Sequence, residues 1–105
     1  MGKKRIQKSL NIFTSRVKKE FRPKNLILFG SYDSGEATDY SDIDILVVAE
    51  KLADIPYEKR IDVLYELTRD LHPDFHVYGL TPKEYASTSS LTIVEEIKRH
   101  GVNLI

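Results

Sequence analysis

The sequence contains no cysteine and no tryptophan among its 105 residues. Without cysteine the chain can form neither a disulfide nor a thiolate metal site, so any bound metal must be held by oxygen or imidazole ligands. No apolar run approaches the ~20 residues of a membrane-spanning helix. The basic start, residues 1–5, is not followed by the apolar stretch of a signal peptide. We therefore expect a soluble, cytoplasmic protein without a membrane segment.

The sequence also has no net charge, because 16 Lys and Arg residues balance 16 Asp and Glu residues. The two signs are nevertheless unevenly distributed. Residues 1–24 hold nine basic residues and a single acid, Glu20, whereas the remaining chain holds seven basic residues and fifteen acids. Such asymmetry can indicate an acidic partner, a nucleic acid or a nucleotide. A solvated helix face explains it more simply, and direct binding of nucleic acid is not expected.

The length predicts one domain, residues 1–105, with one hydrophobic core. Apolar residues recur every three or four positions up to Phe21, which predicts an amphipathic N-terminal helix, residues 1–23, packed on that domain and ended by Arg22 and Pro23. The remaining pattern predicts strands at 25–29, 42–49 and 74–78, helices at 57–71, from 82 and at 91–100, and a closing segment at 102–105. The fold class is therefore α/β (α+β), a small mixed β-sheet flanked by helices.

Two acidic residues begin the second predicted strand. Asp42 and Asp44 are two positions apart, so their side chains would leave the strand on the same face. Two such carboxylates repel each other unless a cation or water lies between them. The first strand ends at Gly30 and Ser31, where backbone amides and a hydroxyl can approach an anionic ligand. The pattern predicts a divalent metal, magnesium or manganese, beside a phosphate-binding bend.

Two better-known loops fit this stretch poorly. Gly30 and Gly35 have the glycine spacing of a P-loop, but Glu36 and Ala37 stand where that loop needs Lys and Ser or Thr. A calcium loop starting at Asp42 fails because residues 45–48 are apolar where further ligands are required.

The stretch Gly30-Ser31, Gly35 and Ser41-Asp42-Ile43-Asp44 resembles the signature of the DNA polymerase beta-like nucleotidyltransferase superfamily. It is most similar to the minimal nucleotidyltransferase (MNT) family, whose members are often paired with HEPN-domain proteins. The resemblance implies the polymerase beta-like nucleotidyltransferase fold. It further implies transfer of a nucleoside monophosphate, AMP from ATP, to an acceptor hydroxyl.

The resemblance also implies roles for particular residues. Asp42, Asp44 and Asp74 would be the catalytic residues and the ligands of two Mg²⁺ ions, which Mn²⁺ can replace. Gly30, Ser31 and Ser41 would bind the nucleotide. His76, on the face of Asp74, could assist proton removal, although a packed, hydrogen-bonded histidine is the commoner role on a strand.

The resemblance implies partners as well. They would be a nucleoside triphosphate and either a HEPN-domain toxin, for which this protein would be the antitoxin, or further copies of the chain. Two functions remain open: an active protein adenylyltransferase, and a catalytically silent nucleotide-binding module that neutralises a partner. A small-molecule acceptor ranks below both, because nothing in the sequence encloses one.

Overall fold

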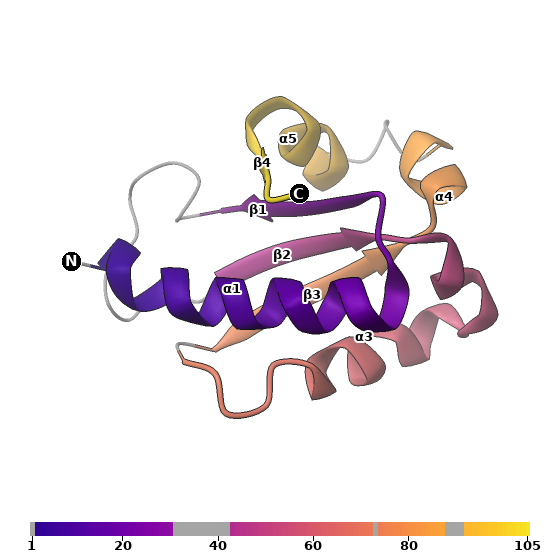
Figure 1. Ribbon diagram of the computed structural model, residues 1–105. Coiled ribbons are helices and arrows are strands. Elements are labelled where there is room, and N and C mark those ends of the chain that lie inside the picture. Colours follow the sequence, from indigo (N-terminus) through magenta and orange to yellow (C-terminus); the bar gives the residue numbers. More distant parts are fainter. Residues whose placement is uncertain (1, 31–42, 73, 88–91) are drawn as a thin grey trace.

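A four-stranded mixed sheet forms the centre of the computed structural model, which describes residues 2–30, 43–72, 74–87 and 92–105 (Figure 1). Strands β1 (Asn25–Phe29), β2 (Ile43–Val48), β3 (Phe75–Leu80) and β4 (Val102–Asn103) lie in the order β3-β2-β1-β4. The β1–β2 and β1–β4 pairs are antiparallel, and β2–β3 is parallel. The end of β1 and the starts of β2 and β3 therefore meet at one end of the sheet.

Helix α1 (Gly2–Phe21), the 3-10 helix η1 (Glu50–Asp54) and helix α3 (Tyr57–Glu66) cover one face of the sheet. The predicted apolar stripe of α1 is buried, and its Phe13 ring lies 5.1 Å from the ring of Phe75. Arg22, just after the helix, has a positive φ of 47°. The predicted end of the helix before Pro23 is thus confirmed.

The other face carries a smaller core built around α5 (Thr92–His100). Ile97 of this helix packs with Ile27, Leu46 and Val48, and Tyr85 of α4 (Pro82–Ser87) lies against the same cluster. Helices on both faces explain why β2 is apolar along almost its whole length. None of the helices in the described ranges is long and apolar enough to cross a membrane.

The start of α4 is a capping box, as its sequence predicts. The Glu84 amide donates to Thr81 Oγ1 at 3.1 Å, and the Thr81 amide donates to Glu84 Oε1 at 2.8 Å. The two bonds satisfy amides that a helix start would leave unpaired. At the end of α5 the Gly101 amide donates to the Ile97 carbonyl at 2.8 Å, and the predicted closing segment pairs with β1 as β4.

Helix α3 differs from its prediction in length and in orientation. It ends at Glu66 rather than at residue 71, and turns follow up to Asp70, whose φ is +67°. Leu64 is buried as expected, but Ile61, expected on the same apolar face, is 48% exposed. Arg60 is buried in its place at 5% exposure. The helix is thus rotated so that a charged residue faces β3.

Candidate active site

The candidate active site lies at the end of the sheet where β1 stops and where β2 and β3 begin. Asp44 pairs across the antiparallel ladder with Phe29 and across the parallel ladder with His76. Its neighbours Ile43 and Ile45 point into the core beneath α1 and α3, so alternation directs the Asp44 side chain to the opposite face. There it remains one-quarter exposed.

Gly30 brings the backbone directly against this carboxylate. Its φ of +78° lies in the left-handed region that glycine occupies without penalty. A β-carbon built on Gly30 would overlap the Asp44 Oδ2 atom. The conformation and the close approach both require glycine, so the bend after β1 and the second aspartate form one unit. This is the juxtaposition that the sequence predicts.

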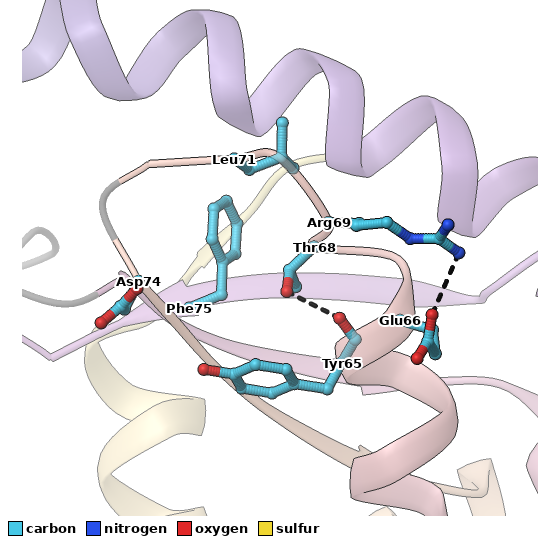
Figure 2. A pocket seen from close by; sticks show the side chains of 7 residues that line it. All are labelled: Tyr65, Glu66, Thr68, Arg69, Leu71, Asp74 and Phe75. Atoms are coloured by element: carbon cyan, nitrogen blue, oxygen red, sulfur yellow. Dashed lines mark hydrogen bonds and ion pairs between the residues drawn. The ribbon is translucent and has the colours of Figure 1, made fainter.

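Asp74 stands immediately before β3 at the same end of the sheet. Its carbonyl accepts a hydrogen bond of 2.9 Å from the Ile43 amide, which fixes the backbone beside the start of β2. Figure 2 shows the Asp74 carboxyl extending away from the ring of its buried neighbour Phe75. His76 is the residue of β3 that lies directly opposite Asp44, and Asp74 stands two residues before His76 in the chain.

His76 contacts Asp44 through its side chain. The His76 Nδ1 atom lies 3.5 Å from Asp44 Oδ1, and the imidazole is about half exposed. The Tyr78 ring, on the same face of β3, lies 6.0 Å from the Phe29 ring. The exposed part of this sheet face thus combines a carboxylate, an imidazole and an aromatic pair.

The predicted site is only partly covered by the described residues. Gly30, Asp44 and Asp74 gather at one end of the sheet, whereas Asp42, Ser31 and Ser41 lie outside the described ranges. Within these ranges, no group of three or more His, Asp and Glu side chains is arranged to hold a metal. Asp44 and Asp74 supply carboxylate oxygens, the donors that Mg²⁺ and Mn²⁺ prefer. The chemistry of the donors therefore fits a divalent ion.

A cavity of about 300 Å³ adjoins Asp74 on the α3 side of the sheet. Figure 2 shows its lining, which the turn after α3 and the start of β3 provide: Tyr65, Glu66, Thr68, Arg69, Leu71, Asp74 and Phe75. Thr68 Oγ1 donates to the Tyr65 carbonyl at 2.7 Å, and Arg69 pairs with Glu66 at 3.0 Å. The periodicity of residues 57–71 gave no sign of this cavity, because it arises where the helix ends early.

The sequence pattern of the nucleotidyltransferase domain matches residues 8–102. The chain belongs to this nucleotidyltransferase domain family. Its fold, a mixed sheet with helices on both faces, agrees with a solved structure titled as a "putative nucleotidyltransferase from Sulfolobus solfataricus", with a TM-score of 0.70. The two chains are 19% identical, and the match covers 97% of this chain and 81% of the other. At that identity the likeness is evidence for the fold alone, and it confirms the predicted fold class.

Two curated relatives from Methanocaldococcus jannaschii are more similar in sequence. The "Putative protein adenylyltransferase MJ1305" is 36% identical over 83 residues, which cover 76% of this chain and 53% of that protein. The "Putative protein adenylyltransferase MJ0604" is 38% identical over 63 residues, covering 58% of this chain and 59% of that protein. The chain therefore spans a little more than half the length of these relatives.

Proposed function

We propose that this protein is a nucleotidyltransferase that transfers AMP from ATP to an acceptor hydroxyl. The observation that carries the proposal is the close approach of Gly30 to the Asp44 carboxylate, at the end of the sheet where Asp74 precedes β3. Membership of the nucleotidyltransferase domain family supports it. Transfer joins the acceptor oxygen to the α-phosphorus, and the bond from that phosphorus to the bridging oxygen breaks, releasing pyrophosphate. The proton of the acceptor hydroxyl passes to a base or to water.

In this proposal Asp42, Asp44 and Asp74 hold two Mg²⁺ ions, which Mn²⁺ can replace. When bound, such ions lower the pKa of the acceptor hydroxyl and neutralise the triphosphate. Gly30, Ser31 and Ser41 bind the phosphates of ATP. Gly30 contributes its backbone, since the left-handed bend leaves the space beside Asp44 free of a side chain.

We propose that the acceptor is a hydroxyl-bearing side chain of another protein, in particular a tyrosine. The names of the two Methanocaldococcus relatives, both protein adenylyltransferases, support this assignment. The resemblance to the MNT family further favours a HEPN-domain toxin as the acceptor protein, with this chain acting as its antitoxin. In this role residues 1–105 act as one nucleotidyltransferase domain in the cytoplasm.

The proposal is tested by incubating the protein with Mg²⁺ and ATP carrying its label on the α-phosphate, together with the HEPN-domain protein encoded nearest to it. We expect the α-phosphate label to appear on the acceptor protein. ATP labelled on the γ-phosphate should leave the acceptor protein unlabelled, because that phosphate leaves with pyrophosphate. Asp44→Asn should abolish labelling. Asp54→Asn is the matched control, because Asp54 is exposed at the end of η1, beyond the other end of β2.

Equal labelling by wild type and Asp44→Asn would refute the assignment of the site. If ATP binds but no acceptor is labelled, while the Asp44→Asn variant still neutralises the toxin, the protein is a catalytically silent nucleotide-binding module instead.

A further inference from the structure

Three large apolar side chains lie exposed along one side of α3. Tyr57, Ile61 and Tyr65 are four residues apart, so they follow one another along the helix surface. Their exposed fractions are 62%, 48% and 46%. We call these three residues the α3 stripe. Single exposed apolar residues are ordinary, but a contiguous row of them is typical of an interaction surface.

A row of acids runs beside the α3 stripe. Glu58, Asp62 and Glu66 are again spaced by four residues, each one position after a member of the stripe, and all three are exposed. Arg69 pairs with Glu66 at 3.0 Å, so the charge of the row is concentrated at Glu58 and Asp62. An apolar centre with a charged border is the usual composition of a protein interface.

The Tyr57 end of the stripe contacts a buried arginine. The Arg60 guanidinium lies 5.5 Å from the centre of the Tyr57 ring. Arg60 itself donates to the Ile55 carbonyl at 3.1 Å and pairs with Glu84 at 2.6 Å. Tyrosines are among the residues that most often dominate the affinity of an interface.

The other end of the stripe, Tyr65, lies at the cavity beside Asp74. Tyr65 lines the cavity that Asp74 and Phe75 also line, and in Figure 2 its hydroxyl points toward the Asp74 side of the cavity. Among the described strands β3 forms the edge of the sheet next to α3. A protein bound on the stripe would therefore lie beside the cavity that Asp74 lines.

We propose that the α3 stripe and its acidic row form a docking surface for a partner protein that presents apolar side chains bordered by Lys and Arg. Charge complementarity selects this partner over a second copy of the chain packed through its own α3. If two α3 helices packed together around a twofold axis, Glu58 and Asp62 of one copy would face the same acids of the other, which is destabilising.

The basic helix α1 of a second copy would avoid this repulsion between acids, but it does not match the α3 stripe. Its exposed positions include Lys8, Lys18 and Lys19, but no large hydrophobic side chain among its described positions is exposed. It could match the acids but not the α3 stripe. The docking surface goes beyond the proposed function, since it requires neither ATP nor catalysis.

The test uses the full chain and two synthetic helical peptides. One peptide carries a leucine stripe bordered by Lys and Arg, and the other carries Glu at every basic position. Fluorescence anisotropy should show that the full chain binds the basic peptide more tightly than the acidic one, with an affinity that falls as salt is added. Ile61→Ser should weaken binding by about tenfold or more.

Val102→Ser is the matched control, because Val102 is 49% exposed, nearly the same as Ile61, but lies on β4. It should bind the basic peptide as the wild type does. The double variant Glu58→Lys/Asp62→Lys should reverse the preference between the peptides. Because Glu58 and Asp62 are both exposed, the double variant should remain folded, with a cooperative thermal unfolding transition like that of the wild type.

Equal binding of the two peptides, or equal losses in Ile61→Ser and Val102→Ser, would overturn the proposal. So would a wild-type dimer that Ile61→Ser converts to a monomer, because the occupant would then be a second copy. Asp44→Asn should bind the basic peptide normally, which separates a failure of the docking surface from a failure of the proposed active site.

Discussion

Gly30 and Asp44 approach each other so closely that a β-carbon on the glycine would overlap the carboxylate of the aspartate. The two residues are neighbours in space because β1 and β2 run antiparallel, with Phe29 opposite Asp44. The absence of a side chain at position 30 is therefore a requirement of the Asp44 environment, in addition to a requirement of the turn.

Replacing this glycine should disable the site more than the fold. Gly30→Ala places a β-carbon in the left-handed region, which costs about 1–2 kcal/mol, and displaces the Asp44 carboxylate. We expect loss of AMP transfer in a protein that still unfolds cooperatively in urea.

Gly79→Ala is the control for a glycine substitution as such. Its β-carbon would lie 2.8 Å from Leu64 Cδ1, in the core under α3 and away from Asp44. It should lower the free energy of unfolding while the folded fraction keeps its specific activity. If Gly30→Ala retained full activity, the close approach to Asp44 would have no functional meaning.

Helix α1 should be indispensable to the fold. Phe13 is fully buried and its ring contacts the Phe75 ring. Phe13→Ala should therefore cost about 3–5 kcal/mol of unfolding free energy, from lost burial and from the cavity that remains. Urea denaturation measures this cost. Ser15→Ala, at an exposed position of the same helix, should change the free energy of unfolding very little; equal effects of the two substitutions would contradict the packing of α1.

Glu84 should make the stability depend on pH in acid. The hydrogen bond from Arg60 is the main cause that lowers the pKa of Glu84 below its ordinary value of 4.5; burial opposes it, and the bond from the Thr81 amide adds to it. Because the folded-state pKa is the lower one, the stabilisation is complete above the ordinary value. It is lost as the pH falls through the folded-state pKa.

Thermal unfolding measured from neutral pH down to about pH 3 should thus show a decline in wild type that is shallower in Glu84→Gln. Glu20→Gln, on the exposed surface of α1, controls for the loss of one negative charge. Parallel profiles for wild type and Glu84→Gln would show that the Arg60 pair does not contribute to the pH dependence.

The sequence predicted best those features that depend on nearby residues. The capping box needs only Thr81 and Glu84, three positions apart, and both of its hydrogen bonds are present. Strand β1 is a continuous apolar run between polar residues, and its bounds agree with the prediction. The closeness of Gly30 and Asp44 was also expected, because the sequence places a phosphate-binding bend at Gly30 beside the strand that carries Asp42 and Asp44.

Features that depend on distant partners were missed. The guanidinium of the buried Arg60 pairs with Glu84, 24 residues further along the chain, and no periodicity in α3 indicates that partner. The early end of α3 was missed for a related reason. Leu71 remains buried after the helix has ended, so the apolar spacing continues through turns that are no longer helical.

The most direct test of the site is the binding of Mn²⁺ in the presence of a non-hydrolysable ATP analogue, followed by electron paramagnetic resonance. Asp44→Asn keeps the shape of the side chain but removes its charge, whereas Asp54→Asn changes an exposed acid beyond the other end of β2. We expect wild type and Asp54→Asn to bind Mn²⁺ with the same affinity, and Asp44→Asn to lose on the order of tenfold or more. Equal Mn²⁺ affinity in all three proteins would contradict a metal-dependent site at Asp44.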